Sequence, residues 1–372
     1  MQVDCQAGVG LVGSVTGGGT KMARRYHSSL EGSIERHFPG NHAINCMCHS
    51  TENIYQMRDT AVVRASDDFY PREAASSTPH IAACAYNSLF LGALCQPDWD
   101  MFQSQHSAAR LHAVARAVSG GAVYVSDKVG KHDFDVLKQL VLRDGSVLRA
   151  LRPGLPTADC IFCDPLRDRG TALKVWSVNA HTGVLAVFHL QGSSWDRQRR
   201  RFTQAAAPPP PLTAHAAAAD VEAIADVVAA APGAATGDFA VLRNGSGAVS
   251  LLGQERRTIP VPLDAADADI LTITPVAEGA GGVRFAPLGL RGMLNSGGAV
   301  ARWEAVRRGF AVALRGEGEF VAWCGAAPAA VTVDGDAVGA GAAGWRWADD
   351  VLSVTVLADA GAPVAHDVVV TF

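Results

Sequence analysis

Residues 60–71 carry the sequence TAVVRASDDFYP, in which a short apolar run ends in two neighbouring carboxylates. We expect a β-strand at Thr60–Ala65, followed at once by Asp67 and Asp68. A helix with few charges is expected next, at Pro79–Cys95, where a further proline follows and stops it. A strand followed by a helix is the repeating unit of parallel α/β proteins.

The same alternation continues on both sides of this unit. Residues 20–38 place apolar side chains at helical spacing, and Pro39 and Gly40 follow, as is common where a helix ends. The further expected elements are the tail of a strand at Val3-Asp4, a helix at Thr20–Phe38, a strand at Ala43–Cys48, a helix at Gln105–Ser119, a strand at Ala122–Ser126 and a helix at His132–Leu142. This order predicts parallel strands joined by crossover helices, hence an α/β layer or barrel.

From Gly145 onward the pattern changes to short β-type runs that Gly, Pro, Asn or Asp separate. The runs are Leu173–Val178, Gly183–Leu190, Phe239–Leu242, Ala248–Leu252 and Asp269–Thr274. Such a pattern is typical of an antiparallel β domain. Residues 205–219, rich in Ala and Pro, are expected to form a loop. We therefore predict two domains, at 1–148 and at 149–372, the second of them β-sandwich-like.

Composition and charge exclude several classes of protein. The 372 residues are enough for two domains, and 48% hydrophobic residues are too many for a disordered chain. No apolar run is long enough to span a membrane, and a net charge of −4 gives no general attraction to nucleic acid. The basic residues Arg197, Arg199, Arg200 and Arg201 lack an interleaved aromatic ladder, which favours a solvated loop. We expect neither a nucleic-acid nor a membrane partner.

The eight cysteines allow two interpretations. No signal sequence opens the chain, so the first is reduced thiols in a cytosol-like compartment. The second is a zinc site, since Cys46-Met-Cys48-His49 and Cys160-Ile-Phe-Cys163 group potential ligands. Zinc ligand pairs usually flank a tight turn, whereas the residues around Cys46 and Cys48 alternate like a strand. Buried thiols are favoured, and we expect no metal.

Carboxylates follow the expected strands of the first half. In parallel α/β folds the functional residues gather at the C-terminal ends of the strands. The acidic residues at such positions are Asp4, Asp67, Asp68, Asp98, Asp100 and Asp127. Like charges around one mouth drive carboxylate pKa values apart, which suits an acid and a nucleophile. Trp99, between two of them, would suit a sugar ring. The alternative role for each Asp is to cap the following helix.

Several short motifs are similar to those of one family. They are RASDDFYP at 64–71, AYNS at 85–88, QPDWDMF at 96–102, YVSDK at 124–128, LRDGSVLR at 142–149, FAPLGL at 285–290 and MLNSGG at 293–298. In order and spacing they resemble the raffinose synthase, seed-imbibition protein and alkaline α-galactosidase family, within glycoside hydrolase family 36. The resemblance covers most of the chain except residues 205–235 and about the last fifty.

The resemblance implies a retaining, two-carboxylate galactosyl transfer from galactinol to sucrose. The family's nucleophile follows a Lys-Val-Asp-Val-Gln pattern, which QVDCQ at residues 2–6 matches with Asp4 as nucleophile. The family's acid/base lies in the Ser-Asp-Asp segment, so Asp67 is the first candidate and Asp68 the second. The substrate-binding candidates are Gln2, which replaces the family's lysine, and Arg64, Asp98, Trp99, Asp100 and Asp127. Two carboxylates suffice for this chemistry, so no cofactor is expected.

The fold class expected is α/β, with the C-terminal part of a (β/α)8 TIM barrel followed by an antiparallel β domain. We count about five strand–helix units where a closed barrel needs eight, so we expect an N-terminally truncated member of the family. Two alternative functions stay open at this point, an α-galactosidase that uses water as acceptor and a catalytically inactive fragment. The expected compartment is the cytoplasm, with a plastid as the alternative.

Overall fold

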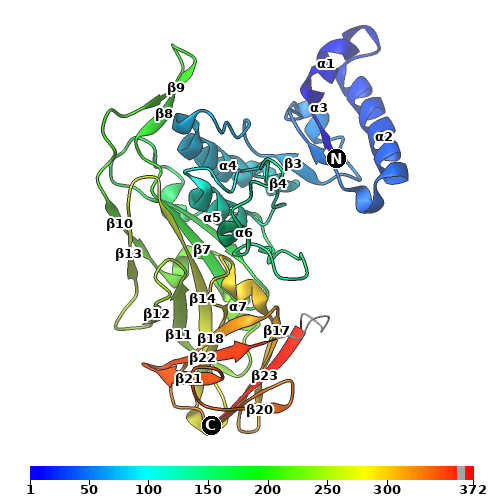
Figure 1. The fold of residues 1–372 in the computed structure, drawn as a ribbon. Helices are drawn as coiled ribbons and strands as arrows, with labels where there is room; N and C mark the ends of the chain where they lie inside the picture. The colour runs from blue at the N-terminus through cyan, green and yellow to red at the C-terminus, as the bar shows by residue number, and fades with distance from the viewer. Residues whose placement is uncertain (358–364) are drawn as a thin grey trace.

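The computed structural model describes residues 1–357 and 365–372 (Figure 1). Its first half contains a four-stranded parallel sheet in the order β1-β2-β3-β4, the order of the chain itself. With η for 3-10 helices, the elements of this half are β1 (Gln2–Val3), η1 (Gln6–Gly8), α1 (Val9–Val12), η2 (Gly13–Val15), α2 (Gly19–His37), η3 (Pro39–Asn41), β2 (Ile44–Asn45), α3 (Thr51–Ile54), β3 (Val62–Arg64), η4 (Ala74–Ser76), α4 (Ser77–Leu91), β4 (Gln96–Asp98), α5 (Ala109–Ser119) and α6 (Phe134–Leu137). Helical segments join the successive strands, as the sequence predicts.

The second half is almost entirely antiparallel β structure. Its elements are β5 (Leu155–Pro156), η5 (Ala158–Cys160), β6 (Leu173–Val178), β7 (Gly183–Phe188), β8 (Ser193–Asp196), β9 (Arg201–Gln204), β10 (Leu212–Ala216), η6 (Ala218–Asp220), α7 (Ile224–Ala229), β11 (Ala234–Arg243), β12 (Val249–Leu252), β13 (Ile259–Leu263), β14 (Ala268–Glu278), η7 (Ala280–Gly282), β15 (Arg284–Leu290), η8 (Ser296–Ala299), β16 (Val300–Val306), β17 (Gly309–Arg315), β18 (Gly318–Cys324), β19 (Ala330–Val333), β20 (Asp336–Val338), β21 (Trp345–Ala348), β22 (Val351–Val356) and β23 (Ala365–Thr371). A ten-stranded sheet runs β21-β22-β18-β15-β14-β7-β6-β5, with β11 and β12 joined at β14. A five-stranded sheet, β16-β17-β23-β19-β20, packs near its C-terminal end.

Helix α5 connects the two halves. It contacts β6, β7 and β14 of the large sheet, and one apolar core joins Leu111 and Val118 of α5 to Val175 and Ile270 of those strands. Because this face of the large sheet is covered by helices, β6, β7 and most of β14 are buried on both faces. The large sheet of the β-rich half therefore provides the surface on which the helices of the first half pack.

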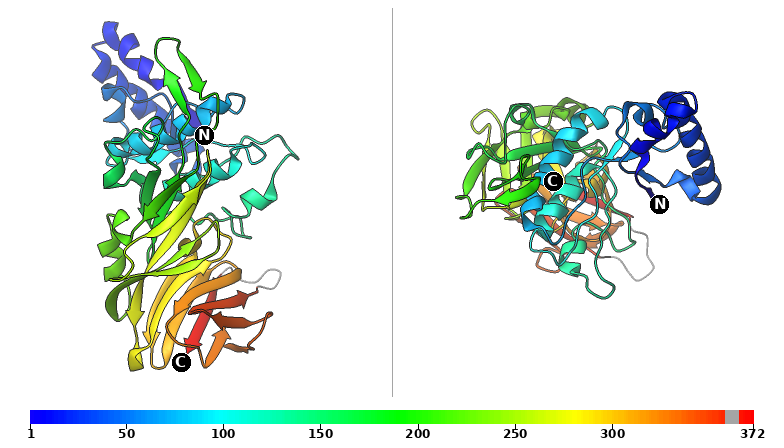
Figure 2. Two further views of the ribbon diagram at one scale, coloured as in Figure 1. Left: turned by 90° about the vertical axis from the view of Figure 1, so that its left-hand side faces the viewer. Right: turned by 90° about the horizontal axis from the view of Figure 1, so that it is seen from above.

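Helix α2 and its neighbours α1 and α3 lie at the end of the molecule away from the C-terminal strands (Figures 1 and 2). The helix buries Ala23, His27, Glu31 and Ile34, one turn apart. Of the apolar side chains predicted at helical spacing, Ile34 is buried, whereas Met22, Tyr26, Leu30 and Phe38 are only half-buried. Glu31 Oε1 accepts hydrogen bonds from the backbone of residues 58–60 and from Thr60 Oγ1. This carboxylate orders the turn that leads into β3.

Three predicted elements need correction. The strand expected at Ala122–Ser126 is reduced to one parallel bridge between Phe102 and Val125, and the helix expected at His132–Leu142 to α6. The Ala/Pro loop expected at 205–219 is wrong in its second half, where β10 pairs with β13. In β10, Leu212, Ala214 and Ala216 are partly or fully buried, whereas Thr213 and His215 between them are exposed, so the composition hid a strand with period two.

The parallel sheet of the described residues has two ends, β1 and β4, and does not close on itself. What the structure shows is thus a mixed α/β half and a β-rich half, and not a barrel. Within the described ranges, no helix is both long enough and apolar enough to cross a membrane.

We predict that Gly289→Ala strongly destabilises the β-rich half. Gly289 lies at a bulge in β15 with φ of +95°, and a Cβ there would meet the Ser296 carbonyl oxygen at 1.9 Å. The strained left-handed backbone and the overlap with Ser296 both destabilise the folded state. The free energy of unfolding, measured by urea denaturation, should therefore fall by at least about 2 kcal/mol.

Gly292→Ala is the matched control. Gly292 has a similar φ of +86° but no heavy atom within 4 Å of its Cβ position, so only the left-handed backbone is strained. A cost of about 1–2 kcal/mol is expected there. Equal losses in the two variants would contradict the role assigned to the contact with Ser296.

Candidate active site

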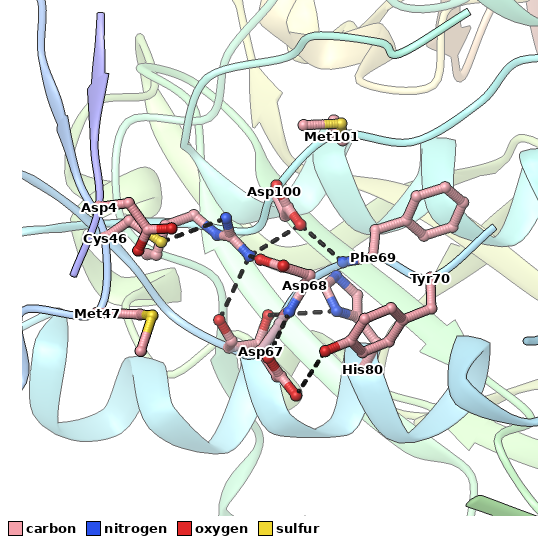
Figure 3. Close-up of polar contacts among 12 residues, drawn as sticks. Asp4, Cys46, Met47, Asp67, Asp68, Phe69, Tyr70, His80, Asp100 and Met101 are labelled. Atoms are coloured by element: carbon pink, nitrogen blue, oxygen red, sulfur yellow. Dashed lines mark hydrogen bonds and ion pairs between the residues drawn. The ribbon is translucent and has the colours of Figure 1, made fainter.

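Carboxylates gather where the parallel strands end. Asp4 follows β1, Asp67 and Asp68 follow β3, and Asp98 ends β4. Because all four strands are parallel, these positions lie along one edge of the sheet. Figure 3 shows Asp4 beside Cys46, with Asp67 and Asp68 between this pair and Tyr70.

Asp4, Asp67 and Asp68 line the same cavity, although more than sixty residues separate Asp4 from the other two. We call this space of about 550 Å³ the carboxylate cavity. Its further lining includes Cys46, Met47, His49, Ile54, Ser66, Tyr86, Asn87 and Phe90. All three carboxylates are exposed to solvent. The structure thus brings together the three residues that the sequence predicted as catalytic.

A second cavity, of about 750 Å³, lies on the other side of the Asp67–Asp68 turn. We call it the hairpin cavity, because the hairpin of β8 and β9 forms one of its walls. Its lining includes Ser66, Asp67, Asp68, His80, Tyr86, Asp164, Arg167, Trp195, Arg197 and Phe202. Asp67 and Asp68 therefore border both cavities, whereas Asp4 borders only the carboxylate cavity.

The buried side chain of Arg64 contacts the Asp67–Asp68 turn and holds it in place. Its guanidinium group is 1% exposed and contacts Asp100 Oδ2 at 2.8 Å, Asp68 Oδ1 at 3.1 Å and Asp98 Oδ1 at 3.8 Å. Asp100 Oδ2 also accepts a hydrogen bond from the Phe69 backbone. Burial raises the pKa of Asp98, although hydrogen bonds from Tyr124 and the Asp100 backbone and the nearby cation oppose it. One cation thus ties β3, β4 and the acidic turn together.

His80 of α4 contacts the same turn from its other side. Its Nδ1 lies 3.3 Å from Ser66 Oγ, which donates to the Asp67 carbonyl oxygen. Its Nε2 lies 3.2 Å from the Trp99 carbonyl oxygen and 3.4 Å from Arg116 Nη2. Complete burial, aided by the Arg116 cation, lowers the pKa of His80 to about 4. The ring is therefore neutral at neutral pH.

Trp99 requires a correction. The sequence predicted an indole face for a sugar, but Trp99 is 0% exposed and its Nε1 donates to Ser88 Oγ of α4. Successive side chains of an extended segment point to opposite sides, so Trp99 points away from the side that its two Asp neighbours share. Here it lies in the core between α4 and the sheet. Asp98 and Asp100 are buried as well and contact Arg64 instead of lining either cavity.

Two other predicted binding residues lie outside the cavities. Gln2 is exposed on β1. Asp127 accepts hydrogen bonds from the Ser104 backbone and hydroxyl, and its Oδ2 lies 3.1 Å from His132 Nδ1. Burial alone would raise the pKa of Asp127, but these contacts outweigh it and hold the pKa below its usual range. The structure therefore gives Asp127 a role in joining two loops.

Several other residues of the site were not among the candidates predicted from the sequence. Tyr70 donates from its hydroxyl to Asp67 Oδ2 at 3.1 Å, which its position three residues away could have suggested. Trp195, Arg197 and Phe202 come from a hairpin more than a hundred residues away. Only the packing of that hairpin on η4 and α4 brings them here.

Cys46 and Cys48 carry protonated thiols at neutral pH. Burial raises the pKa of Cys46 to about 11 and that of Cys48 to about 12. The two do not continue one strand, because β2 ends at Asn45 and Met47 has a positive φ of 46°. Among residues 1–357 and 365–372, no group of three or more His, Cys, Asp or Glu could hold a metal ion.

Comparison with known proteins gives the family. The family model described as raffinose synthase or seed imbibition protein Sip1 matches residues 1–356. The chain belongs to this family. It is 45% identical over 343 residues to "Probable galactinol–sucrose galactosyltransferase 1" of Arabidopsis thaliana, covering 91% of this chain and 45% of that protein. It is 41% identical over 359 residues to "Galactinol–sucrose galactosyltransferase" of Oryza sativa subsp. japonica, covering 91% and 44%.

The chain thus spans less than half the length of these curated relatives. A solved structure with some likeness is α-galactosidase I from Mortierella vinacea, with a TM-score of 0.44 and 12% identical residues. The match covers 68% of this chain and 63% of that one.

We predict that Arg64→Met destabilises the raffinose synthase family chain by about 3–5 kcal/mol, because it leaves Asp98 and Asp100 buried without their cation. The free energy of unfolding in urea measures this. The matched control is Asp68→Asn, which removes only the exposed partner of the same cation and should cost less than about 1 kcal/mol. A loss in Arg64→Met no larger than in Asp68→Asn would show that the buried contacts do not stabilise the turn.

We also predict that stability falls in acid partly through His80. An unfolded chain protonates this ring near pH 6.5, whereas the folded chain does so only near pH 4. Between these values the unfolded state binds more protons, so the contribution is complete above pH 6.5 and is lost as the pH falls. The slope is at most about 1.4 kcal/mol per pH unit.

Urea denaturation at a series of pH values from about 7 to about 4 tests this. His80→Gln should lose less stability across that window than the unsubstituted chain. Some slope should persist, since burial beside Arg116 also lowers the pKa of His112. Parallel curves for the two proteins would rule out His80 as a source of the acid sensitivity.

Proposed function

We propose that this chain carries the reacting carboxylates of a retaining galactosyltransferase that takes galactose from galactinol to sucrose. The observation that carries the proposal is the convergence of Asp4, Asp67 and Asp68 on the carboxylate cavity at the ends of parallel strands. Relatives at 41–45% identity bear the names of galactinol–sucrose galactosyltransferases, which supports this choice of donor and acceptor.

In this mechanism Asp4 attacks the anomeric carbon of the galactosyl donor. The bond to the departing oxygen breaks as the acid/base carboxyl group gives that oxygen its proton. A covalent galactosyl–Asp4 ester results. The acceptor hydroxyl then attacks the same carbon, its proton passes to the acid/base carboxylate, and Asp4 leaves. Two inversions give net retention, and the acid/base residue ends as it began.

Asp67 suits the acid/base role better than Asp68. The Asp67 side chain accepts hydrogen bonds from the Asp68 backbone and the Tyr70 hydroxyl, both of them neutral donors. Asp68 is in contact with the Arg64 cation, which stabilises the charged form of a carboxylate. An acid must hold its proton until the leaving group departs, so the residue away from the cation is favoured.

The buried residues around Arg64 act as positioning residues in this proposal. Arg64, Asp98 and Asp100 hold the turn that presents Asp67 and Asp68, and they need not touch the sugar. We further propose that residues 1–148 form part of a (β/α)8 barrel and residues 149–372 a separate β domain. Four parallel strands in chain order, joined by helical segments, support the first assignment.

Hydrolysis of α-galactosides is the second candidate function. It is favoured by the exposure of Asp4, Asp67 and Asp68, since water can reach the carboxylates. The same intermediate serves both reactions, and only the acceptor differs. The products formed with and without sucrose therefore distinguish a transferase from an α-galactosidase.

We predict that Asp4→Asn and Asp67→Asn each lower raffinose formation from galactinol and sucrose by about 100-fold or more, because each removes one reacting carboxylate. Chromatography of the products measures this. Asp144→Asn is the matched control, because Asp144 is an exposed aspartate that accepts hydrogen bonds from the backbone and hydroxyl of Ser146 and does not line either cavity. An Asp4→Asn protein as active as the Asp144→Asn protein would refute the proposal.

The two roles are separable with azide and p-nitrophenyl α-galactoside. Asp4→Gly should form β-galactosyl azide, because azide replaces the nucleophile on the face opposite the leaving group. Asp67→Gly should form the α-azide, because azide then attacks the galactosyl ester from the acceptor side. The opposite pairing of product and variant would reverse the assignment.

A further inference from the structure

The hairpin of β8 and β9 reaches from the β-rich half to the acidic turn of the first half. In Figure 1 it rises beside α4, and it packs on η4 and on that helix. Its strands pair antiparallel, with Trp195 directly opposite Phe202. A two-stranded hairpin is marginal alone, so contact with α4 and η4 holds it in place.

Aromatic side chains form a row from the tip of this hairpin to Asp67. The rings of Trp195 and Phe202 lie 5.0 Å apart at 68°, and those of Phe202 and Tyr70 lie 6.3 Å apart at 55°. Tyr70 in turn donates its hydroxyl to Asp67 Oδ2. The row therefore ends on the carboxylate proposed as acid/base.

These aromatic side chains keep part of their surface exposed to solvent. Trp195 remains 43% exposed and Tyr70 38% exposed, although both contact other rings or the acidic turn. Arg197, two residues after Trp195, lines the same cavity and makes no ion pair with any residue that the structure describes. A half-exposed indole beside free polar groups is the arrangement that binds an apolar ring face with a polar rim.

The position of the acidic turn assigns the two cavities to different parts of the reaction. An acid/base carboxylate must reach the oxygen between the transferred sugar and its leaving or accepting partner. It therefore lies at the border of two binding sites. Asp67 borders both the carboxylate and the hairpin cavity, and Asp4 borders only the first. The transferred galactosyl group then belongs beside Asp4, and its partner belongs on the side of the hairpin.

We propose that the hairpin cavity is the acceptor subsite, which binds an uncharged di- or oligosaccharide with one sugar ring on Trp195. This assignment rests on the galactosyl transfer proposed above. The lining carries three carboxylates, Asp67, Asp68 and Asp164, against the two cations Arg167 and Arg197, so its net charge is small and favours a neutral ligand. Its volume of about 750 Å³ lies within the range of small-molecule pockets.

Direct binding of sucrose tests the proposal without any turnover. Isothermal titration calorimetry of the whole chain with sucrose should give a measurable dissociation constant. Trp195→Ala should raise that constant by about tenfold or more. Trp195→Phe keeps a ring in place and should recover most of the loss. Circular dichroism and the melting temperature show whether each variant is folded.

Arg197→Ala and Arg201→Ala form a matched pair on the same hairpin. Arg197 lines the cavity, whereas Arg201 is exposed and does not line it. Arg197→Ala should weaken sucrose binding and Arg201→Ala should leave it unchanged. Absence of sucrose binding by the unsubstituted chain, or equal binding by folded Trp195→Ala protein, would overturn the acceptor assignment.

Kinetics separate this inference from the proposed function. If raffinose formation requires Asp4 but the KM for sucrose is the same in Trp195→Ala protein, the transfer proposal stands and the acceptor assignment fails. If Trp195→Ala abolishes sucrose binding but Asp4→Asn does not lower transfer, the sugar site stands and the proposed mechanism fails. A rise in KM for sucrose in Trp195→Ala, together with loss of turnover in Asp4→Asn, supports both.

Discussion

The guanidinium group of Arg64 lies at the end of β3 with Asp68, Asp98 and Asp100 around it, and the arrangement of the site depends on this cation. Two buried carboxylates would be costly without a partner, and an unpaired buried arginine equally so. Together they are tolerated, and they connect two neighbouring strands with the turn that follows one of them. The turn that carries the exposed Asp67 and Asp68 is therefore held in place by this group of buried charged residues.

The β-rich half supplies more than support. Its large sheet packs on α5, and its β8–β9 hairpin packs on α4 and η4, so the acidic turn is held between the two halves. A cavity that one half lines with carboxylates and the other with aromatic rings can exist only while these contacts persist. The function that we propose thus depends on the interface between the halves as well as on the strand ends.

The sequence predicted well those features that follow from local pattern. The helices α2 and α4 were expected within a few residues of their observed bounds, and β6 was expected at Leu173–Val178, where it lies. The convergence of Asp4 with Asp67 and Asp68 was also expected, because parallel strands place their ends at one edge. Errors arose where composition obscured the period, as in β10, where Ala214 and Ala216 take the inward-facing positions.

The sequence by itself determined the order of strands and helices, the family, and the acidic residues that end the strands, because all of these depend on residue type and spacing along the chain. Only the tertiary structure decided which of those residues face a cavity. Trp99 is buried against α4, while Trp195, which no local pattern marked, lines a cavity together with Asp67. The physical reason is that burial and proximity depend on contacts between segments far apart in sequence, and no spacing within either segment encodes them.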